Sequence, residues 1–99
     1  MLDIDFADAG VVVLKGRLDA SQSEKAQTFL DGLDQASVLD FSNLEYISSA
    51  GLGVLLRTQK RLMASGGGLK LINVNNHIMD VFRFSGFDHI FEVQGAVDP

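Results

Sequence analysis

The chain has 99 residues, of which 46% are hydrophobic, so it can bury one core but has no room for a catalytic domain beside a regulatory one. Its formal net charge is −5, and no segment gathers the cations that bind a phosphate backbone, so we expect no nucleic-acid partner. The absence of cysteine excludes disulfides, thiolate metal sites and a cysteine nucleophile. We treat residues 1–99 as a single domain.

The start of the chain predicts a β-hairpin. Apolar and acidic side chains alternate over residues 2–6, the period of a strand with one solvated face, and residues 8–10 have turn chemistry. The β-branched and aliphatic run at 11–14 predicts a strand that is covered on both faces. Residues 1–5 lack the features of a signal peptide, and no run reaches membrane-spanning length. We therefore expect a cytoplasmic protein without direct membrane insertion.

A first amphipathic helix is expected over about residues 21–35. Ser21 and Glu24 have the spacing of a capping box at its start. A buried strand at 38–41 and a loop at 42–48 are predicted to follow it. The apolar residues of this helix recur at helical spacing and define its buried face: Ala26, Phe29, Leu30 and Leu33.

A second amphipathic helix is expected over about residues 50–65. The glycines at 66–68 end it, because glycine readily takes the left-handed conformation that helix C-termini often need. We expect its apolar stripe to be buried beside the first helix, and this stripe consists of Leu52, Leu55, Leu56, Leu62 and Met63.

The last third of the chain predicts a strand, a helix and a short final strand. The strand lies at 69–73, and Asn75 or Asn76 caps the helix, which Gly86 stops. Residues 90–93 can add the final strand. The apolar residues of this helix share one face: Ile78, Val81 and Phe82.

The order of these elements predicts an α/β fold. A strand–helix–strand succession implies parallel pairing, whereas the opening hairpin is antiparallel, so the sheet must be mixed. We predict about four to five strands, with helices mainly on one face and a frayed tail at 94–99.

The segment Ser48–Gly53 (SSAGLG) is the most informative part of the sequence. It lies where a strand gives way to the start of the second helix. The first turn of a helix has free backbone N–H groups and a partial positive charge, so an anion on a serine there is stabilised. Ser49 is thus either a phosphorylation switch or simply the cap of the helix.

Residues 44–55 (LEYISSAGLGVL) resemble the signature of STAS domains, the family of anti-sigma factor antagonists and of the cytosolic domains of sulfate transporters. The turn at 16–19 (GRLD), the strand at 38–41 (VLDF) and the closing helix at 81–87 (VFRFSGF) match further parts of the fold. Together these segments extend the resemblance over nearly the whole chain.

The resemblance implies a regulatory switch. In bacterial antagonists of this family, a partner that is both an anti-sigma factor and a serine kinase phosphorylates a serine at the start of this helix. The matching acceptor is Ser49, flanked by Ala50 and Gly51, and Ser48 stands where the family often has aspartate. A PP2C-type phosphatase is a second implied partner. No cofactor and no catalytic residue are expected.

Two further sets of residues are candidates for the surface around Ser49. Asp19 and Asp40 follow or end strands, so they can form an acidic surround for Ser49 or serve turns and caps. Arg57 and Arg61 lie one turn apart on the polar side of the helix, and Val54 lies outside its apolar stripe. We predict that Val54, Arg57 and Arg61 contact the partner, although an ordinary solvated face is the alternative.

Two rival functions remain open. One is a STAS subunit that regulates a transporter ATPase complex. The other is a small enzyme with Ser49 as nucleophile, which needs a general base, and the fold would have to bring His77 or His89 beside Ser49. These histidines have no carboxylate or cysteine constellation beside them, so no metal site is proposed.

Overall fold

Five strands form one mixed sheet in the order β1-β2-β3-β4-β5 in the computed structural model, which describes residues 1–8 and 10–96. β1 and β2 pair antiparallel, and all later neighbours pair parallel, which confirms the predicted hairpin and mixed sheet. The strands are β1 (Leu2–Asp8), β2 (Val11–Leu18), β3 (Ser37–Ile47), β4 (Leu69–Val74) and β5 (Glu92–Gly95).

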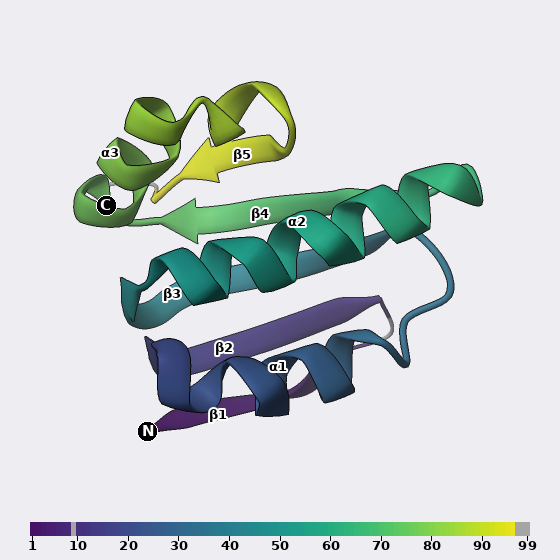
Figure 1. Ribbon diagram of the computed structural model, residues 1–99, viewed down its shortest axis with the longest axis horizontal. Helices are drawn as coiled ribbons and strands as arrows, with labels where there is room; N and C mark the ends of the chain where they lie inside the picture. The colour runs from purple at the N-terminus through teal and green to yellow at the C-terminus, as the bar shows by residue number, and fades with distance from the viewer. Residues whose placement is uncertain (9, 97–99) are drawn as a thin grey trace.

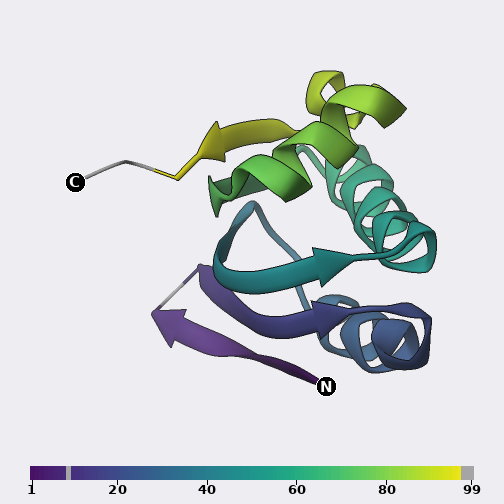
Figure 2. The ribbon, with the colours of Figure 1, turned by 90° about the vertical axis from the view of Figure 1, so that its left-hand side faces the viewer.

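Two of the helices lie side by side on one face of the sheet, and the third lies at its β4–β5 side (Figures 1 and 2). They are α1 (Ser23–Leu30), α2 (Ser49–Ala64) and α3 (Asn76–Ser85), and the 3-10 turns are η1 (Ala20–Gln22) and η2 (Phe87–His89). The predicted α/β fold with helices mainly on one face is confirmed. No helix in the described part of the chain is long and apolar enough to cross a membrane.

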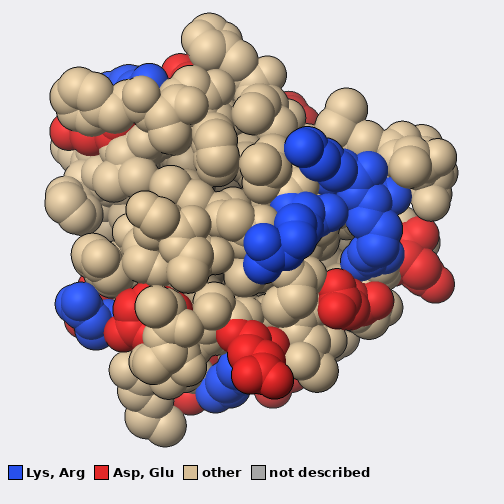
Figure 3. Space-filling view, in the orientation of Figure 1, with Lys and Arg blue, Asp and Glu red and all other residues tan. Residues whose placement is uncertain are grey.

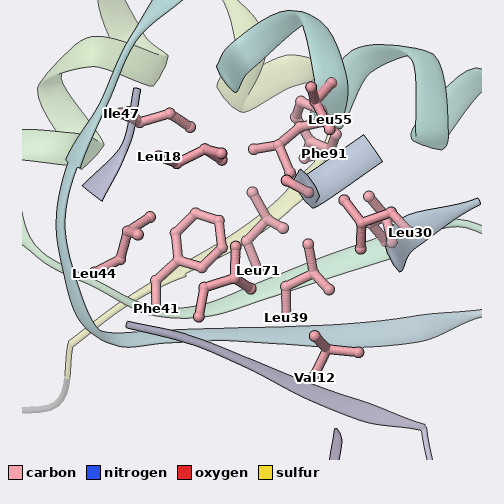
Figure 4. Close-up of a cluster of buried hydrophobic side chains, with 14 of the residues drawn as sticks. Val12, Leu18, Leu30, Leu39, Phe41, Leu44, Ile47, Leu55, Leu71 and Phe91 are labelled. Carbon is pink, nitrogen blue, oxygen red and sulfur yellow. The ribbon is translucent and has the colours of Figure 1, made fainter. Parts of the chain in front are cut away.

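A single hydrophobic core lies between the helices and the sheet (Figure 4). Alternate residues of the central strands, such as Leu39 and Phe41 of β3, point into it and are completely buried. The ring of Phe41 stacks on that of Phe82 in α3, with 6.5 Å between centroids, and Phe82 in turn contacts Phe91. This aromatic row attaches α3 to the sheet.

Several predicted boundaries are wrong, and long-range pairing explains the largest difference. Residues 42–47 form the second half of β3 rather than a loop, because they pair with β2 across two irregularities of register. The helix α1 is shorter than predicted, and Ser21 does not cap it: its hydroxyl donates to Asp19, and Gln22 stands at the N-cap without a side-chain bond. Residues 94–95 belong to β5, and 97–99 lie outside the described residues.

The predicted ends of α2 and α3 are confirmed. After α2, the N–H of Gly67 donates to Leu62 and that of Gly66 to Met63, a Schellman arrangement in which Gly66 has φ +84°. At α3, the side chain of Asn75 accepts from the Ile78 N–H, and Gly86 ends the helix with φ +76°. The residues that cap these helix ends were therefore predictable from the local sequence.

The predicted buried stripe of α2 is only partly right. Leu52, Leu55 and Leu62 are buried, but Leu56 is half-buried and Met63 is 57% exposed. The buried face of α2 extends further around the helix than predicted, because α2 also buries Gly51, Val54, Thr58 and Gln59. On α1, Leu30 is buried as predicted, whereas Phe29 is half-buried.

Leu55 should contribute strongly to stability, because its side chain is completely buried between α2 and the sheet. We expect Leu55→Ala to lower the free energy of unfolding by about 2–5 kcal/mol, through lost apolar burial and the cavity that remains. Chemical denaturation measures this change. Met63→Ala on the same helix is the matched control and should change stability by less than about 0.5 kcal/mol. Equal losses for the two variants would contradict the burial pattern.

Candidate functional site

The cap of α2 is formed by Ser48, and Ser49 is the first helical residue. The Ser48 hydroxyl accepts from the Gly51 N–H at 3.1 Å, and the Ser48 N–H donates to the Leu18 carbonyl at 2.9 Å. Ser49 is exposed, and its hydroxyl makes no hydrogen bond to any described residue. The alternative that Ser49 serves as the cap is therefore wrong, and its hydroxyl is accessible.

Close contact with β2 fixes the position of the first turn of α2. A Cβ on Gly51 would lie 2.8 Å from both the Cγ and the carbonyl oxygen of Leu18, and 3.0 Å from Cγ1 of Ile47. A glycine is needed here because the helix backbone approaches β2 too closely for a side chain. The neighbouring Ala50 is exposed, so Ser49 and Ala50 together form the outer surface of this turn.

A polar cluster formed by Arg17, Asp19 and Tyr46 lies at the ends of β2 and β3, next to the residues Leu18 and Ile47 that contact this turn. Asp19 directly follows Leu18, and its carboxylate accepts from the Ser21 hydroxyl at 2.7 Å and lies 3.9 Å from Nε of Arg17. The hydrogen bond from Ser21 is the main reason that the pKa of Asp19 is below its ordinary value. The Arg17 guanidinium also lies 4.3 Å from the ring centroid of Tyr46.

Asp40 is not part of this surround. It lies within β3, where its side chain alternates with those of Leu39 and Phe41, so it projects from the sheet face opposite the core. Its carboxylate accepts from the Ser42 N–H at 2.9 Å and from the Asn73 amide at 3.1 Å. Partial burial raises the pKa of Asp40. The hydrogen bonds together lower the pKa by more than burial raises it, so the pKa is below its ordinary value. The prediction that Asp40 lies near Ser49 is wrong.

The prediction that Val54 lies on the accessible side of α2 is also wrong. Its side chain is completely buried, and its carbonyl accepts from the buried Thr58 hydroxyl at 2.9 Å. Arg57 and Arg61 are exposed as predicted, but each is also tied to α1. Nε of Arg57 donates to the Gln27 side chain at 3.0 Å, and Nη2 of Arg61 donates to the backbone carbonyl of the last α1 residue at 2.9 Å.

A basic patch formed by Arg57, Lys60 and Arg61 covers the outer side of α2 (Figure 3). None of the three cations forms an ion pair with a carboxylate of the described residues, whereas Arg17, Lys70 and Arg83 each do. Like charges at this spacing repel one another within the helix. The patch is therefore a positively charged surface whose charge no carboxylate of the described residues neutralises, on a chain whose net charge is negative.

Lys60 of the basic patch and the contact between Arg17 and Tyr46 were not predicted. Arg17 and Tyr46 are register partners in the parallel pair of β2 and β3, and no local pattern reveals that register. Lys60 could have been found, since it lies three residues after Arg57 and one before Arg61, on the same side of a helix.

The two histidines do not join Ser49 in the structure. His77 is an exposed residue of α3, and His89 is exposed in η2, where its Nε2 lies 3.8 Å from Asp88. Neither forms a hydrogen bond with Ser49 within the described residues. No group of three or more potential metal-binding side chains occurs among residues 1–8 and 10–96.

Gly51 should be intolerant of substitution because of its contact with Leu18. We expect Gly51→Ala to lower the free energy of unfolding by about 1–3 kcal/mol through overpacking, although alanine is the better helix former. Gly53→Ala is the matched control, since among the described residues, apart from the local helix backbone, its Cβ would meet only the end of the flexible Arg57 side chain, at 3.3 Å. Thermal or chemical denaturation compares the two, and a stabilised Gly51→Ala protein would refute the close approach.

Comparison with known proteins agrees with this architecture. A family model described as "Mlab, STAS domain" matches residues 2–94. BtrV of Bordetella bronchiseptica, whose naming as an anti-sigma factor antagonist is itself provisional, is 37% identical over 100 residues, covering 96% of this chain and 86% of BtrV. The anti-sigma F factor antagonist of Paenibacillus polymyxa is 30% identical over 88 residues, covering 84% of this chain and 75% of that protein.

A solved structure shares the fold. The Bacillus cell fate determinant SpoIIAA in its phosphorylated form superposes with a TM-score of 0.68 at 23% identity, covering 94% of this chain and 90% of SpoIIAA. The order and pairing of the elements are thus those of a known domain type.

Proposed function

The chain belongs to the STAS domain family, and from this membership we propose that it is a cytoplasmic anti-sigma factor antagonist that Ser49 switches. Unphosphorylated, it binds an anti-sigma factor and thereby frees a sigma factor; phosphorylated, it is released. One observation carries the proposal: Ser48 satisfies the helix cap and leaves the Ser49 hydroxyl exposed. The names of the two relatives support the class of partner.

The local environment of Ser49 favours a phosphorylated state that keeps the fold. Phosphorylation forms an ester bond between Ser49 Oγ and the phosphorus of the ATP γ-phosphate, releasing ADP and the hydroxyl proton. It adds a charge of about −1.5 to −2. The positive end of the α2 macrodipole stabilises that charge, and Ser49 has no core contact to lose. The cost therefore falls on a packed complex, through desolvation and repulsion.

In this proposal the chain is a substrate of a serine kinase and of a PP2C-type phosphatase rather than an enzyme. The proposed partner surface begins at Ser49 and Ala50 and continues about two and three turns later to Arg57 and Arg61, with Asp19 beside it. All five side chains are at least partly exposed. Val54, which is buried, is removed from this surface.

A subunit that regulates a transporter ATPase is the second candidate, because the STAS family, to which the chain belongs, also includes the cytosolic domains of sulfate transporters. The two functions differ in the partner captured. An immobilised chain that retains an ATP-binding anti-sigma factor supports the first function, and one that retains a transport ATPase supports the second.

Ser49 should be the phosphate acceptor. We expect incubation with the cognate anti-sigma kinase and ATP to place one phosphoryl group on Ser49. The hydroxyl of Ser48 is engaged in the helix cap, whereas that of Ser49 is not. Ser48→Ala should still be phosphorylated, although loss of the cap should cost about 0.5–2 kcal/mol of stability. Ser49→Ala should not be phosphorylated. Phosphopeptide mass spectrometry identifies the site.

Binding provides the second part of this test. Ser49→Asp should bind the kinase more weakly than Ser49→Ala, since only the aspartate brings charge to the interface. Phosphate found on Ser48, or none with a kinase of demonstrated activity, would overturn the switch.

The exposed arginine of the proposed partner surface should affect binding more than folding. We expect Arg57→Glu to weaken binding of the anti-sigma factor, measured by calorimetry, and to shift the free energy of unfolding by only about 0.5 kcal/mol, as exposed substitutions usually do. Arg83→Glu on α3 is the matched control, because Arg83 is also an exposed helical arginine and lies outside this surface. If both variants bind like the original chain, the face does not contact the partner.

A further inference from the structure

The guanidinium of Arg57 lies on the surface of α2 beside Gly53, between Arg57 and Ser49 along the helix. Its Nε donates to Gln27 of α1, and its Nη1 lies 3.3 Å from the position that a Cβ on Gly53 would occupy. The side chain thus extends back toward the N-terminus of α2, the usual direction for long helical side chains. Since Gly53 has no side chain, nothing on this residue separates the guanidinium from the turn that begins at Ser49.

Helix geometry places this charge within electrostatic range of a phosphate on Ser49. Ser49 and Gly53 are one turn apart, so their Cβ positions are about 5–6 Å apart, and Nη1 lies within about 9 Å of the Ser49 Cβ. A phosphoryl group extends beyond Oγ and can shorten this separation. The Debye length is about 8 Å at physiological ionic strength, so salt only partly screens the attraction.

Arg57 differs in this respect from the other cations of the basic patch. Arg61 lies a further turn from Ser49 and donates to the carboxyl end of α1 through Nη2. Lys60 has no hydrogen bond within the described residues that holds its ammonium in place. Arg57 is held through Nε alone, which leaves its four remaining N–H donors available.

We propose that Arg57 is the intramolecular counter-charge of phosphorylated Ser49, an inference that rests on the proposed function for the identity of the modified residue. Arg57 stabilises the dianionic phosphoserine and is thereby withdrawn from the partner surface. Phosphate and partner then compete for one guanidinium, so the modification removes a favourable contact as well as adding a repulsive one.

The test measures the second pKa of the phosphate, which is ordinarily about 6. Phosphoserine is incorporated at position 49 during translation, and its ³¹P chemical shift is followed against pH at low ionic strength. A nearby cation favours the dianion, so we expect this pKa to be about 0.5 unit lower in the original chain than in the Arg57→Gln chain. Raising the salt to about 1 M, where the Debye length is about 3 Å, should remove most of the difference.

Arg61→Gln is the matched control and should leave the phosphate pKa close to that of the original chain. Asp19 and Arg17 are charged residues on either side of Leu18, but both are present in every variant, so their contributions cancel in the comparison. Equal pKa values with and without Arg57, or an equal rise in Arg61→Gln, would overturn the proposal. Because no kinase is used, a missing pKa difference refutes only the role of Arg57, whereas a kinase that fails to modify Ser49 refutes only the switch.

Discussion

The contact between the end of β2 and the first turn of α2 determines the geometry of the proposed switch. The Leu18 carbonyl accepts from the Ser48 N–H, and Leu18 occupies the space that a side chain on Gly51 would need. These two features fix where α2 begins and which serine caps it. The next residue, Ser49, is then exposed at the positive end of a sixteen-residue helix.

The same arrangement separates stability from regulation along one helix. The inner side of α2 buries residues such as Leu55 against the sheet, and its outer side carries Ser49 and the basic patch. A charge added at Ser49 therefore meets solvent and helix N–H groups rather than the core. This separation suits a protein whose partner affinity must change while its fold does not, which is the behaviour proposed for this chain.

The sequence predicted the fold class, most of the elements and the start of α2, because these depend on local periodicity and cap chemistry. It could not decide between Ser48 and Ser49 as the cap, since that choice depends on a hydrogen bond to a distant strand. Val54 was misplaced because it lies outside the apolar stripe that the spacing predicted, yet α2 also buries Val54 and Thr58, whose hydroxyl is bonded to the Val54 carbonyl. Residues 42–47 mix polar and apolar side chains and were predicted as a loop, and pairing with β2 makes them a strand.

The most direct test of the central claim is a comparison of backbone amide NMR spectra of the chain with serine and with phosphoserine at position 49. The account predicts that chemical shifts change only in the first turn of α2, around residues 18–20 and near Arg57. Amides of the core strands should keep their shifts and their protection from hydrogen exchange. Changes spread through β3 and α3, or loss of protection at the Ser48 N–H, would show that phosphorylation alters the fold and would contradict the account.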